Sequence, residues 1–191
     1  CKRWGIEIDD SAGQSYTNTR VGSYLILLIE TICADIKPVS LLDFCKHSLC
    51  KPQGYDHWRS DIRILDQHLL RGAMFEAGIK GYDKKLSNLD KDAQKYPYKK
   101  PMAQKCRDVF ENIIEKLNPI LFLLNQGSHH PLSSWIKSHI ECAENFCPKD
   151  ILWSGQDGEA LSIFLTELMA NAKHMGDITA HDYLTILTSL M

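Results

Sequence analysis

Apolar residues that recur every three or four positions place the strongest constraint on what this chain can fold into. From about residue 20 onward, Leu, Ile, Phe and Trp recur at this spacing in successive stretches, separated by Pro, Gly and Asn. The period is that of an amphipathic helix, whereas a half-buried strand would alternate at every second residue. Strands alternating with helices, typical of an α/β domain, are missing from the pattern. The sequence therefore predicts an all-α, irregular domain of about seven or eight helices.

Capping and breaking residues suggest where these helices begin and end. Asn18 or Thr19 can cap a central helix over 20–34, and Pro38 suits the first turn of the next helix. Further helices are expected over about 56–77, unless Gly72 kinks this helix or ends it early, over 102–124, from 132 and from about 159. A last helix is expected after Thr179, whose partner Asp182 makes a near capping box. Over 78–102, few apolar residues stand among two glycines, two prolines and many lysines. We therefore expect at most a short helix around 83–94, then a loop, in the most mobile segment of the chain.

Residues 1–19 have the pattern of an extended lead-in. Ile6 and Ile8 alternate with polar residues and run into the turn-forming residues 10–13, which predicts one short strand and a turn. One strand forms no sheet by itself. Because the sequence starts at Cys1 and its last residue lies within a helical pattern, we expect an excerpt of a longer protein, in which 20–191 is the helical domain.

The seven cysteines are an odd number and are scattered along the chain. This usage favours reduced, buried thiols in a cytoplasmic protein over a disulfide framework. The longest apolar stretch, residues 24–29, is far shorter than the roughly 20 residues that cross a bilayer.

Motifs of catalysis and cofactor binding are missing from the sequence. It contains no G-x-x-x-x-G-K-[ST], G-x-G-x-x-G, G-x-S-x-G or H-E-x-x-H pattern, the signatures of phosphate-binding loops, dinucleotide sites, hydrolase elbows and zinc proteases. We expect neither enzymatic activity nor a cofactor within these residues.

Two groups of cysteine and histidine leave a zinc-stabilised helical domain as an alternative. Cys45, His47, Cys50 and His57 are all competent zinc ligands within thirteen residues, and His139, Cys142 and Cys147 form a second group. On a helix, however, two residues five positions apart lie about 140° apart around the axis. This spacing disfavours both groups, and no metal ligand is predicted.

The charge distribution carries the main functional signal. The net charge of −2 conceals a window, 80–107, with nine basic and three acidic side chains, and a remainder, 108–191, with four basic and eleven acidic ones. Lysines neutralise phosphates, and tyrosine faces can stack on unpaired bases. The candidate nucleic-acid ligands are Lys84, Lys85, Lys91, Lys95, Lys99, Lys100, Lys105, Arg107, Tyr96 and Tyr98. The alternative is a solvated lysine-rich loop whose tyrosines anchor it to the core.

Five collinear segments resemble the B subunits of AddAB-type, RecBCD-like helicase-nucleases of alphaproteobacteria. They are Gly5–Gly13 (GIEIDDSAG), Pro38–His47 (PVSLLDFCKH), Leu69–Gly72 (LLRG), Leu152–Ala160 (LWSGQDGEA) and Ile178–Leu190. Ser48 departs from the pattern, because the family usually has proline there. The resemblance spans nearly the whole chain.

The resemblance implies a helical 2B-like region inserted into the inactivated helicase half of a subunit for DNA double-strand break repair and recombination. The lone strand would then belong to a neighbouring RecA-like sheet, and the nuclease carboxylates would lie downstream. The implied role is a non-catalytic accessory domain that helps hold DNA beside an AddA-type helicase-nuclease subunit, within an ATP-dependent helicase and exonuclease complex. The alternative is a protein-interaction module without DNA contact, in which the acidic residues 108–191 dock the partner subunit.

Overall fold

α-Helices form most of the structure, a computed structural model that describes residues 15–72, 76 and 78–191. The predicted N-terminal strand lies outside these residues. The helices within them are α1 (Arg20–Cys33), α2 (Pro38–Lys46), α3 (Trp58–Leu65), α4 (Ile79–Lys95), α5 (Lys100–Gln126), α6 (Leu132–Phe146), α7 (Lys149–Leu152), α8 (Gly155–Asn171) and α9 (Ala180–Leu190). The all-α prediction is confirmed. Among the described helices, none is long and apolar enough to cross a membrane.

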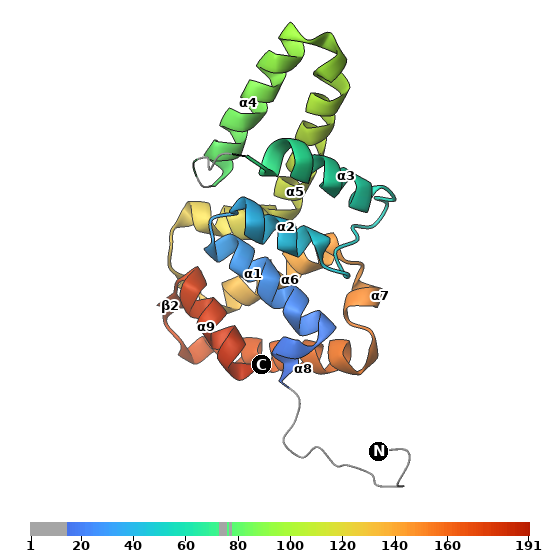
Figure 1. The fold of residues 1–191 in the computed structure, drawn as a ribbon. Helices are drawn as coiled ribbons and strands as arrows, with labels where there is room; N and C mark the ends of the chain where they lie inside the picture. The colour runs from blue at the N-terminus through green and yellow to red at the C-terminus, as the bar shows by residue number, and fades with distance from the viewer. Residues whose placement is uncertain (1–14, 73–75, 77) are drawn as a thin grey trace, which may run out of the picture.

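The central helix is α1, with α2, α6, α8 and α9 packed around it (Figure 1). Of the two candidate caps, Asn18 and Thr19, Thr19 caps it, since its hydroxyl oxygen accepts a hydrogen bond from the Gly22 N–H at 3.0 Å. Tyr24 and Leu25 are fully buried, and the Tyr24 hydroxyl donates to the Ala143 carbonyl oxygen on α6 at 2.8 Å. α1 is therefore apolar around most of its circumference because other helices surround it in the core.

A buried histidine ties three of these helices together. His139 on α6 lies 3.0 Å, through Nε2, from the Leu25 carbonyl oxygen on α1, and 2.8 Å, through Nδ1, from the Tyr183 hydroxyl on α9. A carbonyl oxygen only accepts, so Nε2 carries the proton and Nδ1 accepts from the phenol. Burial lowers the pKa of His139 to about 4, which keeps the ring neutral.

A short antiparallel pairing was not expected from the sequence. β1 (His130–Pro131) pairs with β2 (Asp177–Ile178), with His130 opposite Ile178. The indole N–H of Trp135 donates to the Ile178 carbonyl oxygen at 2.9 Å and holds this connection against α6.

The predicted helix over 56–77 is shorter than expected. It starts at Trp58, its α-helical part ends at Leu65, and a π-helical turn, η2 (Asp66–Leu70), follows. Asp66 accepts hydrogen bonds from Arg71, at the other end of this turn, and from Lys46 at the end of α2. Arg71 foremost, with Lys46, holds the pKa of the Asp66 carboxyl below its usual value.

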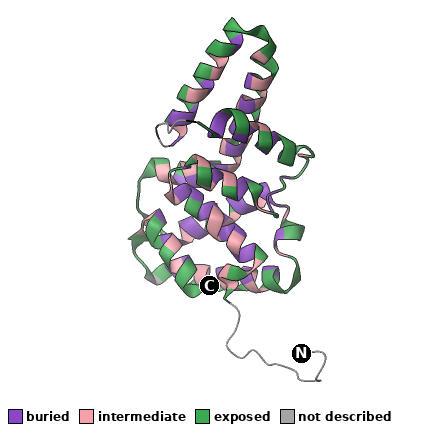
Figure 2. Cartoon of the chain, viewed as in Figure 1, coloured by how far each residue is buried: buried purple, intermediate pink, exposed green. Residues whose placement is uncertain are grey.

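The expectation of at most a short helix and a loop over 78–102 is wrong. α4 is a helix of 17 residues, and it forms an antiparallel hairpin with the start of α5, which is 27 residues long. Figure 1 shows this hairpin rising from the other helices, and Figure 2 shows exposed residues along its outer sides. We call α4, the turn after it and residues 100–110 of α5 the helical arm.

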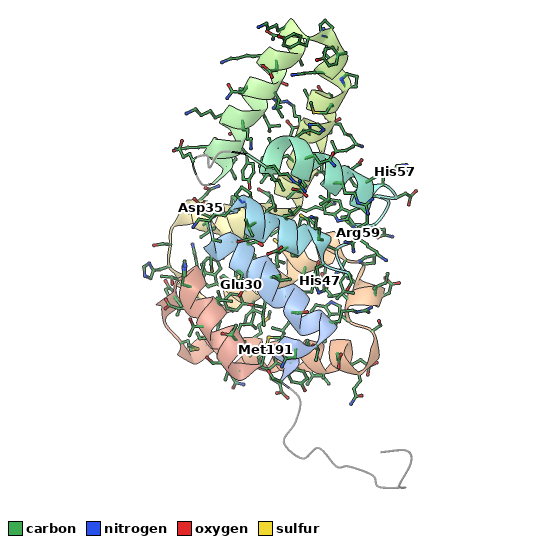
Figure 3. The ribbon with its side chains drawn as sticks, in the orientation of Figure 1. Glu30, Asp35, His47, His57, Arg59 and Met191 are labelled. Atoms are coloured by element: carbon green, nitrogen blue, oxygen red, sulfur yellow. The ribbon has the colours of Figure 1, made fainter. Side chains whose placement is uncertain are left out.

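The first and last described segments lie side by side. The Tyr16 N–H, in the turn η1 (Tyr16–Asn18), donates to the Met191 oxygen at 2.7 Å, and Figure 3 shows Met191 near the start of α1. A side chain at Gly22 would collide with the Tyr16 carbonyl, so this close approach requires glycine there.

Candidate nucleic-acid interface

The helical arm is held together by one narrow apolar strip. At its base, the Tyr82 ring lies with its centroid 4.5 Å from that of Phe110, and the Tyr82 hydroxyl donates to the Ile36 carbonyl oxygen at 2.7 Å. Toward the far end, the buried residues Ala93 and Ala103 are small, which allows the two helices to approach closely. Between these two levels the strip continues with the buried residues Leu86 and Cys106, and the outer sides of the arm are exposed.

Two prolines start helices at the far end of the arm instead of marking a loop. Pro97 opens a 3-10 turn, η3 (Pro97–Lys99), and Pro101 lies in the first turn of α5. Proline suits both positions, because a helix leaves its first N–H groups without intrahelical partners. We define the tip as residues 91–100.

The tip concentrates positive charge on an exposed surface. Lys91, Lys95 and Lys100 are exposed, and Lys99 is half-buried with its Nζ 3.4 Å from an Asp92 carboxylate oxygen. Four lysines and one aspartate make the tip +3. An exposed cluster of this sign attracts phosphates.

Both candidate tyrosines lie at the tip. Tyr98 is 78% exposed and Tyr96 39%, and their ring centroids are 6.1 Å apart. The Lys95 and Lys99 Nζ atoms lie 5.3 Å and 5.0 Å from the Tyr96 ring centroid, within the range of cation–π contacts. Neither ring is buried in the core, so the alternative in which these tyrosines anchor a loop does not describe them.

A hollow of about 550 Å³ runs between α4 and α5 beside the tip. Its polar lining is Asp90, Gln94, Lys100, Gln104 and Arg107, with Ala93, Pro101 and Ala103 between them. The two glutamines were not among the sequence candidates. Only the pairing of the two helices brings them together, so no local signal could have found them.

Three of the ten candidates lie outside the tip and have partners within the fold. Lys105 lies with its Nζ 2.7 Å from an oxygen of the buried Asp61 carboxylate, and Arg107 pairs with Asp90 on α4 and, at 3.7 Å, with Glu111. The Lys85 ammonium donates to the Arg71 carbonyl oxygen at 2.6 Å, and burial lowers its pKa. These side chains stabilise the arm.

The remaining candidates form two groups. Lys84 is exposed on α4 toward the base of the arm, apart from the tip. The tip itself brings together Lys91, Lys95, Tyr96, Tyr98, Lys99 and Lys100. This second group is the candidate interface.

The first zinc candidate group is divided between the core and the surface. Cys45 and Cys50 are buried, and burial raises the pKa of the Cys50 thiol. His47 contacts the Ser23 hydroxyl through Nε2 at 3.3 Å and accepts from the Leu49 N–H through Nδ1, whereas His57 is exposed at the start of α3 (Figure 3).

In the second zinc candidate group, His139 and Cys142 already have partners within the fold. Both ring nitrogens of His139 have partners, and the Cys142 thiol lies 3.6 Å from the Leu117 carbonyl oxygen. In the described part of the chain, no three His, Cys, Asp or Glu residues are arranged to hold a metal ion.

Comparison of the chain with protein-family models, with curated proteins and with solved structures finds no match. The resemblance to helicase-nuclease B subunits therefore stays an interpretation of the sequence motifs. What the chain can bind is indicated by the geometry and charge of the helical arm.

Proposed function

We propose that this chain is a non-catalytic helical module that binds DNA through the tip of its helical arm. The observation that carries the proposal is the gathering of Lys91, Lys95, Lys99 and Lys100 with two exposed tyrosines at the end of a projecting hairpin. Lysines contact phosphates without reading sequence, so the tip would hold DNA in place and leave base recognition to other groups.

The sequence resemblance supports a more specific setting for this role. We propose an accessory domain of a double-strand break repair subunit, working in the cytoplasm beside an AddA-type helicase-nuclease. Free, largely buried cysteines among the described residues agree with a reducing compartment.

The DNA role is tested by titrating labelled duplex and single-stranded DNA at low and moderate salt. A tip variant replaces Lys91, Lys95, Lys99 and Lys100 by Gln. A control variant replaces four exposed lysines elsewhere, Lys37, Lys51, Lys137 and Lys173, so that the net charge of the two proteins is equal.

We expect the tip variant to bind at least tenfold more weakly at low salt. The slope of the logarithm of its binding constant against the logarithm of the salt concentration should become shallower by about 0.7–0.9 for each lost phosphate contact. The control should bind much more strongly than the tip variant. Absence of binding at low salt, or equal losses in both variants, would refute the proposal. In this proposal the chain alone neither hydrolyses ATP nor cuts DNA, and either activity in a rigorously purified sample would overturn the accessory role.

Exposed apolar side chains favour a second candidate, docking of a partner protein. Phe122 at the end of α5 and Ile163 on α8 are each 60% exposed, and Leu190 on α9 is 55% exposed, on a part of the chain with net charge −7. Replacing the three by Ser should weaken binding to the AddA-type subunit and leave DNA binding unchanged. Unchanged association with that subunit would exclude docking through these three side chains.

A further inference from the structure

Tyr98 has the highest exposed fraction among the exposed large hydrophobic side chains of the described residues, at 78%. Three other tyrosines, Tyr24, Tyr82 and Tyr183, are fully buried, and each hydroxyl has a hydrogen-bond partner. Tyr98 has no such place in the core. It lies in η3 (Pro97–Lys99), between α4 and α5, and Figure 1 shows this turn at the end of the arm furthest from the other helices.

Tyr98 lies in a short turn beside basic residues. It is the middle residue of η3, between Pro97, whose ring fixes one backbone dihedral angle, and Lys99. Behind it, the Tyr96 ring is tilted by 52° to the Tyr98 ring and is approached by the Lys95 and Lys99 ammonium groups. The Tyr98 ring therefore lies beside a second ring, 6.1 Å away between centroids, whose neighbours are two ammonium groups that can bind phosphates.

An exposed aromatic face with cations nearby fits an unpaired nucleotide. The base stacks on the ring while the flanking phosphates meet the lysines, and every base has a face for such stacking. In a duplex, base faces are covered by neighbouring base pairs, so the same ring could reach only the backbone. Resting on the DNA-binding role proposed above, we infer that Tyr98 is a stacking platform for an unpaired base and that the tip binds single strands in preference to duplexes.

The inference is tested on the whole chain with four ligands of equal length: a single-stranded DNA, the RNA of the same sequence, the DNA duplex, and a single strand with abasic sites. The variants are Tyr98→Ala and, as the matched control, Tyr98→Phe, which retains the ring. Because Tyr98 is exposed, both variants should fold like the parent, which circular dichroism checks.

We expect Tyr98→Ala to weaken single-strand binding between about fivefold and a hundredfold, with little change for the duplex and for the abasic strand. Tyr98→Phe should bind single strands like the parent. If Tyr98→Ala weakens binding of the single-stranded DNA only, the unpaired base comes from DNA. If it weakens binding of the RNA only, the base comes from RNA.

The outcomes separate the two proposals. If the lysine tip variant loses binding but Tyr98→Ala binds single strands as the parent does, the stacking platform is refuted and the DNA-binding tip stands. If the parent binds no nucleic acid at low salt, both are refuted. Tyr98→Trp adds an optical readout, because stacking on a base should quench the fluorescence of the new indole, and unchanged emission at saturating single strand would refute stacking.

Discussion

The Lys105 ammonium lies 2.7 Å from the buried carboxylate of Asp61 and thereby joins α5 to α3 below the helical arm. The same carboxylate accepts a hydrogen bond from the Tyr55 hydroxyl at 2.9 Å, and burial together with Asp61 raises the pKa of Tyr55. A lysine in the basic window therefore has a partner in the fold.

Replacing Lys105 by Met should destabilise the protein by about 1–3 kcal/mol, because the buried carboxylate of Asp61 loses a charged partner. The matched control is Lys100→Met at the exposed tip, where a change within about 0.5 kcal/mol is expected. Chemical denaturation measures both. Equal stability of the Lys105 variant and the parent would show that the ion pair between Lys105 and Asp61 does not stabilise the fold.

The stability of the fold should fall as the pH is lowered from about 6.5 to about 4. Burial lowers the pKa of His139 from 6.5 to about 4. Over this pH range the unfolded state therefore binds a proton that the folded state does not bind. The loss is on the order of 3 kcal/mol, since each tenfold difference in proton affinity between the two states corresponds to about 1.4 kcal/mol. Above pH 6.5 this contribution is fully present.

The matched variant for this prediction is His139→Gln, whose amide can donate to the Leu25 carbonyl and accept from Tyr183 without titrating. Urea denaturation at several pH values should give a flatter pH dependence for the variant than for the parent. Parallel curves would mean that groups other than His139 control acid stability.

Tyr82→Phe should destabilise the base of the arm by about 1–2 kcal/mol. Its hydroxyl donates to the Ile36 carbonyl oxygen, and both Asp35 and Ile36 have positive φ, 56° and 52°, a conformation that is uncommon for a β-branched residue. Removing the phenol leaves this turn with one less restraint. Denaturation of Tyr82→Phe beside Tyr98→Phe checks the prediction, and equal losses at the two positions would contradict it.

Removing metal should leave the stability of the protein unchanged. Zinc binds the thiolate form of cysteine, whereas the Cys45 and Cys50 side chains are buried and burial raises the pKa of Cys50. Elemental analysis should find no stoichiometric zinc, and a chelator should not shift the unfolding midpoint. Stoichiometric zinc whose removal lowers that midpoint would instead support the zinc-stabilised alternative.

The body of the fold could be predicted from the sequence because its helices carry wide apolar faces and recognisable caps. Thr19, Pro38 and Thr179 all start helices where they were expected, and the capping box of Thr179 with Asp182 is present. Such signals are local, so they can be read from neighbouring residues.

The helical arm was missed although part of its signal is local. Five apolar residues of α4 recur at helical spacing, namely Ile79, Tyr82, Leu86, Leu89 and Ala93, but they form a narrow strip, and the glycines, prolines and lysines around them favoured a loop. The charged partners that hold the arm are distant in the sequence. Asp61 and Asp90, which engage Lys105 and Arg107, lie 44 and 17 positions away from them in the sequence. The basic composition of the tip was visible in the sequence, but which cations stay exposed depends on these pairings.

α5 runs as one helix from the tip of the arm into the packed helices beside α6 (Figure 1). At a rise of 1.5 Å per residue, the 17 residues of α4 span about 25 Å. The arm is therefore a lever: a tilt of about 10° at its base would swing the tip by about 4 Å, given this length. In the opposite direction, a pull on the tip would act as a torque on the core through α5.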